Sequence, residues 1–79
     1  MKTAYRVLFR VNKGRLIDNY TDDVIEVYQF LTDIAFLYLG KGQIWVQSKH
    51  GDFSKEFGEY YSNEVIRAKK QAGIIKPLY

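Results

Sequence analysis

The chain of 79 residues contains no cysteine, one histidine and one proline. Without cysteine, neither disulfides nor thiolate zinc ligands can reinforce a core that is small at this length. Long apolar runs are also missing: the longest, IAFLYL at 34–39, has six residues, whereas a membrane helix needs about 20. Near the start, Arg6 and Arg10 interrupt what would be the apolar part of a signal peptide. We therefore expect one cytoplasmic domain over residues 1–79, outside any membrane.

Motifs for catalysis and metal binding are missing as well. GKG at 40–42 lacks the phosphate-loop frame and follows a predicted helix instead of preceding one. His50 lies beside Asp52 in a predicted turn, and the nearby acids Glu56 and Glu59 have no standard ligand spacing. No serine lies in a nucleophile elbow. We therefore expect no enzyme activity, and we assign no catalytic residue, metal, cofactor or small-molecule substrate.

Charged residues are present, but they are divided along the chain, around a net charge of +3. Residues 1–17 contain five bases and no acid, whereas residues 18–40 contain five acids and no base. Acids at the start of a helix complement its dipole, so the acidic segment suits a solvated helix face. The basic segment contains AYRVLFRV at 4–11, whose strict alternation is typical of a half-buried strand. Its polar face carries Arg6 and Arg10.

The residues after this strand predict a β-hairpin. NKG at 12–14 suits a three-residue loop with its glycine in the left-handed conformation, and RLIDNY at 15–20 is the return strand. In that register Phe9 lies opposite Ile17. A loop of two or four residues would place Phe9 opposite Asp18 instead, and every side chain of the return strand would change face.

The clearest helix is predicted within TDDVIEVYQFLTDIAFLYLGKG at 21–42. Thr21 or Asp22 can cap its start, and Gly40 or Gly42 can take the left-handed stop. A polar stripe lies opposite a broad apolar face, which contains Val24, Val27, Tyr28, Leu31, Ile34, Ala35 and Tyr38.

The polar stripe of this helix does not reach its C-terminal half. Phe36 and Leu37 stand where it would continue, and Phe30 lies on the same flank. A helix that is apolar on all sides is buried on both sides, and a short chain has little material to cover the second side. Either the C-terminal segment folds over Phe30, Phe36 and Leu37, or these residues form a protein interface such as a homodimer seam.

The rest of the chain predicts a strand and a second helix. QIWVQS at 43–48 alternates as a strand, 49–52 suits a turn, and 53–61 is either a fourth strand broken at Gly58 or an irregular loop. SNEVIRAKKQAG at 62–73 is predicted as a helix.

Ser62 or Asn63 is expected to cap this second helix, and Gly73 is expected to end it. The tail 74–79 is expected to dock on the core or to extend a sheet edge. The order ββα–β(β)–α predicts an α+β domain in which an antiparallel sheet packs against two helices.

Two functional hypotheses follow. The first is a non-enzymatic protein-binding module that acts through Phe30, Phe36 and Leu37, since the chain is also rich in tyrosine and phenylalanine. By size and composition it would be an inhibitor, adaptor or regulator of the kind that phages and plasmids encode, with a protein partner or a second copy of itself.

The alternative is a nucleic-acid-binding module that uses the basic hairpin face. Arg6 and Arg10 lie on the strand, and Lys13 lies at the hairpin tip. If 43–48 joins the same sheet with Trp45 outward, the face combines cations, amides and a stacking ring, as single-strand binding sites do. A lone tryptophan is more often core, and the RNP, GXXG and helix-turn-helix patterns are absent.

Overall fold

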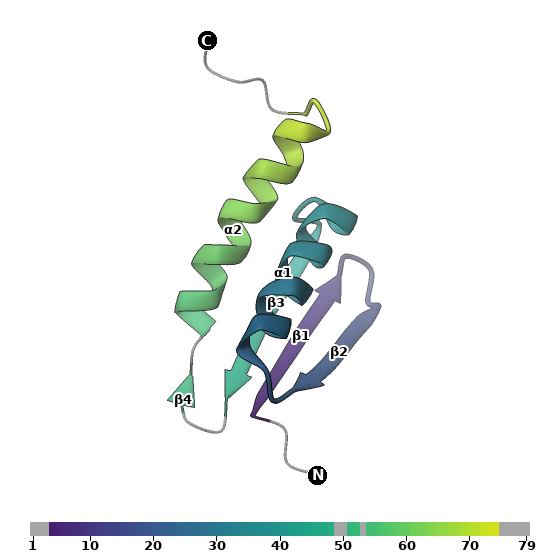
Figure 1. The fold of residues 1–79 in the computed structure, drawn as a ribbon. Coiled ribbons are helices and arrows are strands. Elements are labelled where there is room, and N and C mark those ends of the chain that lie inside the picture. Colours follow the sequence, from purple (N-terminus) through teal and green to yellow (C-terminus); the bar gives the residue numbers. More distant parts are fainter. Residues whose placement is uncertain (1–3, 49–50, 53, 75–79) are drawn as a thin grey trace.

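The computed structural model describes residues 4–48, 51–52 and 54–74, with side chains at 4–48 and 56–74. The elements follow in the order β1 (Tyr5–Val11), β2 (Leu16–Thr21), α1 (Val24–Tyr38), β3 (Gly42–Ser48), β4 (Gly51–Asp52) and α2 (Ser54–Gln71). The strands form one antiparallel sheet in the order β2-β1-β3-β4, in which β4 contributes only two residues (Figure 1). The predicted α+β class and the packing of two helices on an antiparallel sheet are confirmed.

β1 and β2 are joined by the predicted three-residue loop. The Val11 N–H donates to the Arg15 carbonyl at 2.8 Å, and Gly14 has a φ of 99°, which is the left-handed conformation that glycine adopts without strain. Phe9 lies opposite Ile17. The predicted register is therefore confirmed over its alternatives.

α1 begins later than the sequence suggested, and its cap is Asp23, so the expectation of Thr21 or Asp22 was wrong. The Ile25 N–H donates to Asp23 Oδ1 at 2.9 Å. Thr21 Oγ1 instead accepts the Asp23 N–H at 3.0 Å, and Asp22 Oδ1 accepts the Ala4 N–H at 2.7 Å. The Thr21 side chain thus bonds the residue that caps α1, and the Asp22 side chain bonds the residue before β1.

α1 ends in a left-handed turn at Leu39 and Gly40, whose φ angles are 50° and 81°. The prediction for Gly40 is thus confirmed, whereas Gly42 is the first residue of β3. A Cβ on Gly42 would lie 2.4 Å from the Arg10 carbonyl oxygen and 2.5 Å from Phe9 Cζ. Close packing, and not its backbone angle, therefore requires glycine at position 42.

Of the stretch predicted as a strand or an irregular loop, residues 54–61 belong to α2, so that prediction was wrong for them. Ser62 and Asn63 are exposed positions inside this helix and do not cap it. Gly58, the predicted break in a fourth strand, also lies within the helix.

Packing explains why α2 continues through Gly58. Phe57, Tyr61, Val65 and Ala68 are buried at helical spacing along one face. Glycine inside a helix costs about 1 kcal/mol, whereas burying one large apolar side chain contributes about 1.5–3 kcal/mol. The core contacts on both sides of Gly58 therefore outweigh its poor helix propensity.

Gly73 ends α2 as predicted, with a φ of 77°. The Gly73 N–H donates to the Lys70 carbonyl at 3.1 Å, and the Ile74 N–H donates to the Lys69 carbonyl at 2.9 Å. These two bonds form a Schellman cap. Ile74 is exposed, and the rest of the predicted tail, 75–79, lies outside the described residues.

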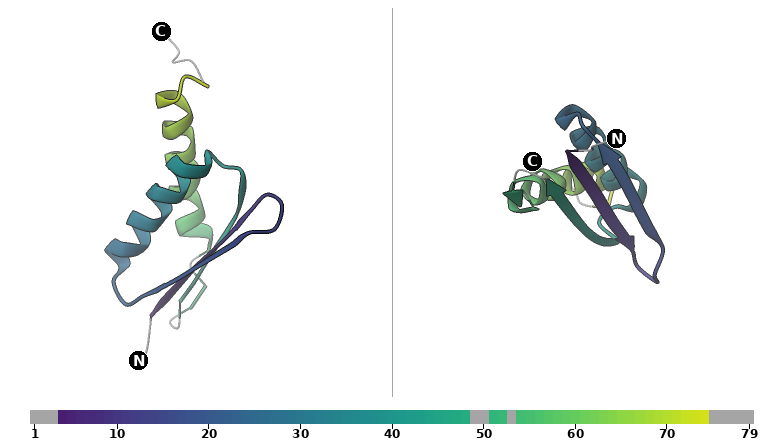
Figure 2. Two further views of the ribbon diagram at one scale, coloured as in Figure 1. Left: turned by 90° about the vertical axis from the view of Figure 1, so that its right-hand side faces the viewer. Right: turned by 90° about the horizontal axis from the view of Figure 1, so that it is seen from below.

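Both helices pack on one face of the sheet, and no other described helix or strand covers the opposite face (Figure 2). The core between sheet and helices contains Val7, Phe9, Val27, Leu31, Ile34, Ala35, Val46, Phe57, Tyr61 and Val65. No helix in the described part of the chain has both the length and the apolar character needed to cross a membrane.

Candidate functional site

The uncovered face of the sheet, here called the open face, carries side chains from three strands. Successive side chains of a strand point to opposite faces, and Val7 and Phe9 point into the core. The open face therefore has three cross-strand rows: Tyr20–Arg6–Gln47, Asp18–Leu8–Trp45 and Leu16–Arg10–Gln43. Cations, amides and rings lie together on it.

Trp45 lies in the middle row of the open face and is 39% exposed. The sequence left open whether Trp45 belongs to the core, and the structure places it on the open face. The inward positions of β3 are taken by Ile44 and Val46, which pack against the core. A shallow pocket beside the indole is lined by Leu8, Arg10, Leu16, Gln43, Trp45 and Gln47.

Arg6 is on the open face as predicted, but it is engaged there. Its Nε donates to Asp18 Oδ1 at 3.0 Å and its Nη2 donates to Asp18 Oδ2 at 2.8 Å. Its guanidinium also lies 5.4 Å from the centroid of the Tyr20 ring. The hydrogen bonds from Arg6 hold the pKa of the Asp18 carboxyl below its ordinary value of 3.8. The charge of Arg6 is thus balanced by Asp18 on the surface of the sheet.

The side chain of Arg10 is exposed, and no side-chain hydrogen bond or ion pair joins it to another residue in the described part of the chain. It belongs to a basic end of the molecule, where the end of β1, the hairpin loop, the α1–β3 turn and the last turn of α2 lie together. The Asn12 N–H donates to the Lys41 carbonyl at 3.2 Å, and Lys69 Cε lies 3.9 Å from where Gly40 would carry a Cβ. The segments that meet at the basic end carry Arg10, Lys13, Arg15, Lys41, Lys69 and Lys70.

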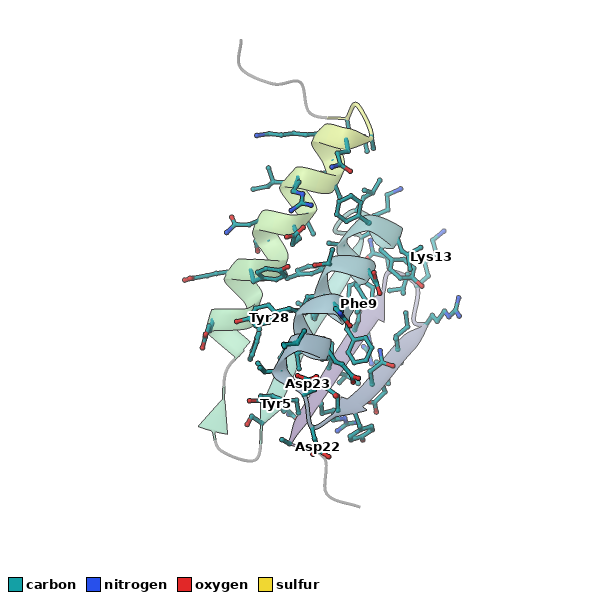
Figure 3. All side chains as sticks on the ribbon, in the orientation of Figure 1. Tyr5, Phe9, Lys13, Asp22, Asp23 and Tyr28 are labelled. Carbon is teal, nitrogen blue, oxygen red and sulfur yellow. The ribbon has the colours of Figure 1, made fainter. Side chains whose placement is uncertain are left out.

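The charges of the molecule are separated along its length. Lys13 lies at one end, whereas Asp22 and Asp23 lie near the other (Figure 3). Both helices run toward the basic end (Figure 1), so their negative C-termini face its cations. The segments 4–17, 34–48 and 65–74 contain no acid. The local positive charge of the basic end is therefore larger than the net charge of +3 indicates.

The predicted interface residues of α1 are covered to different extents. Phe30 is half-buried and packs against the core. Phe36 is half-buried, with the guanidinium of Arg67 at 6.0 Å from its ring centroid. Leu37 is 74% exposed and lines a pocket at the basic end. α2 thus covers part of the predicted interface, and Leu37 remains exposed to solvent.

The described residues contain no group of three or more histidine, aspartate or glutamate side chains able to hold a metal ion. His50 lies outside the described residues.

Four members of the basic end, Arg15, Lys41, Lys69 and Lys70, were not among the predicted site residues. The absence of acids from their segments was visible in the sequence, but their meeting at one end was not. No protein-family model, curated protein or solved structure matches the chain.

Proposed function

We propose that the protein binds nucleic acid through its basic end and the adjoining part of the open face. The observation that carries this proposal is that the hairpin loop, the α1–β3 turn and the last turn of α2 meet at one end of the molecule, and that their segments contain no acid. Clustered lysine and arginine side chains neutralise phosphates and release counterions, which drives association with nucleic acid.

The residues beside the basic end favour nucleic acid as the ligand over a polyanion that has no bases. Arg10 belongs to both surfaces, because it lies at the basic end and in the outer row of the open face. Next to it are an exposed indole and two glutamine amides. Aromatic rings and amides recognise bases, whereas a simple polyanion offers them nothing to stack on or to pair with.

The test is the salt dependence of binding to labelled DNA and RNA oligonucleotides, followed by fluorescence anisotropy. Lys13→Gln and Lys41→Gln should each weaken binding and make the slope of log K against log salt shallower by about 0.7–0.9. Gln29→Glu is the matched control, because it changes the net charge equally from an exposed position on α1. It should leave the slope unchanged.

Three results would contradict the proposal. The first is that no oligonucleotide binds at about 50 mM salt. The second is that Gln29→Glu changes the affinity and the salt slope as much as Lys13→Gln and Lys41→Gln do. The third is that poly-glutamate binds as tightly as the oligonucleotides. The last result would show that charge alone directs binding.

A second candidate function is the binding of an acidic protein partner. The observation that favours it is Leu37, the most exposed large apolar side chain in the described chain, at 74%. Because Leu37 lies among the cations of the basic end, two copies of the chain would meet there with like charges, which disfavours a homodimer through this surface.

Leu37→Asp tests this second candidate without disturbing the core. It should abolish capture of an acidic partner while leaving the unfolding curve unchanged. Phe36→Asp should give the same loss of binding, and it also removes the contact with Arg67. Capture that disappears on nuclease treatment would count for nucleic acid and against a protein partner.

A further inference from the structure

We infer that the nucleic acid is single-stranded and that one of its bases stacks on Trp45 between Gln43 and Gln47; this inference rests on the proposed function. The three residues lie on one strand and on one face, at alternate positions of β3. Each glutamine is therefore about 6.5–7 Å along the strand from the tryptophan.

The side chains around the indole can recognise an unpaired base. A ring that is 39% exposed on an uncovered sheet offers one aromatic surface to a ligand. Both glutamines are exposed, and an amide side chain carries both hydrogen-bond donors and acceptors. Bases in single strands are recognised in this way, by stacking on a ring and by hydrogen bonds to their edges.

The distribution of charge on the open face also indicates that phosphates and bases bind at different places. Arg6 is held by Asp18, so Arg10 is the cation on this face that no described residue neutralises. Arg10 lies toward the basic end. We therefore expect the phosphates to bind at the basic end and the bases to bind along the row that contains Trp45.

A duplex fits this charge pattern poorly. It carries phosphates along both of its strands, and a sheet that contacts a groove needs cations toward both sides. The rows farther from the basic end instead contain Asp18, whose charge is balanced by Arg6, and the acids Asp22 and Asp23 lie beyond them (Figure 3). Single-stranded nucleic acid needs cations on one side only.

The test uses the intrinsic fluorescence of Trp45, the one tryptophan of the chain. A thymidine oligonucleotide of about 16 nucleotides, the upper end of common site sizes, should quench its emission and bind more tightly than a duplex of equal length. Trp45→Ala should weaken single-strand binding about 5- to 150-fold, and Trp45→Phe should retain most of the affinity because it keeps a ring.

Ile25→Ala is the matched control, because it removes an exposed apolar side chain from α1, away from the open face, without removing a ring. It should leave the affinity unchanged. The variants at Trp45 should melt as the wild type does, because the inward side of β3 is formed by Ile44 and Val46.

The outcomes separate this inference from the proposed function. Salt-dependent binding in which the duplex is bound as tightly as the single strand, or in which Trp45 emission does not change, overturns the inference and leaves nucleic-acid binding standing. An absence of binding to every oligonucleotide overturns both. Equal loss of affinity in Ile25→Ala and Trp45→Ala also overturns the stacking role.

Discussion

Gly42 and Gly58 should respond in opposite ways to the same substitution, alanine. A Cβ at Gly42 would lie 2.4 Å from the carbonyl oxygen of Arg10, 2.5 Å from Cζ of Phe9 and 3.0 Å from its Cε1. The Arg10 oxygen belongs to the backbone of the central strand, and Phe9 is fully buried. Neither atom can move without disturbing the pairing of β1 with β3 or the packing of the core.

The expected loss follows from this overlap. Forcing an extra carbon into a well-packed core costs about 1–3 kcal/mol. In a domain of this size 1 kcal/mol lowers Tm by about 4–8 °C, so Gly42→Ala should melt about 4–24 °C below the wild type. Such a loss is a large part of the total stability of a short chain, about 0.05–0.15 kcal/mol per residue.

Gly58→Ala is the internal control, because no atom beyond its chain neighbours and the backbone of its own helix lies within 4 Å of where its Cβ would stand. Replacing glycine inside α2 should raise the free energy of unfolding by about 0.5–1 kcal/mol. Thermal melts and urea titrations of both variants, followed by circular dichroism, measure the two effects. A Gly42→Ala protein as stable as the wild type would refute the contact of β3 with Phe9 and Arg10.

Three further substitutions test other parts of the structure. Asp23→Ala should lower the free energy of unfolding by about 0.5–2 kcal/mol in urea titrations, because the Ile25 N–H loses its acceptor; an unchanged midpoint would contradict this cap. Asp18→Asn should destabilise most at neutral pH, because Arg6 lowers the pKa of the Asp18 carboxyl below 3.8 and the carboxylate therefore stabilises the fold only above that range. The difference from the wild type should vanish as the pH falls through the lowered pKa, and a constant difference would refute the pairing. Tyr61→Phe should raise Tm by an amount equivalent to about 1 kcal/mol, because the buried Tyr61 hydroxyl has no hydrogen-bond partner in the described chain; a lower Tm would show that this hydroxyl is bonded.

The parts of the fold that were predictable are those governed by neighbours in sequence. The hairpin register follows from alternation in β1 and from Gly14 in its loop, since both act over a few residues. The apolar face of α1 follows from its period in the same way. Residues 54–61 were misread, because the packing of Phe57 and Tyr61 against other elements outweighs the local effect of Gly58.

The candidate site was predictable in its residue types and much less in its arrangement. Arg10, Lys13 and Trp45 were named from the sequence as one surface, and the structure places Arg10 and Trp45 on the open face and Lys13 at the hairpin loop. The pairing of Arg6 with Asp18 depends on the register of two strands. The same alternating pattern is compatible with a free Arg6.

By itself the sequence determined where the strands of the hairpin and α1 lie, which faces they bury, and that acids are missing from three segments. Only the tertiary structure decided that Trp45 faces outward and that Lys41 and Lys69 join the hairpin loop at one end. The reason is physical: periodicity, caps and turns act between residues a few positions apart, whereas these two features depend on which distant segments share a core.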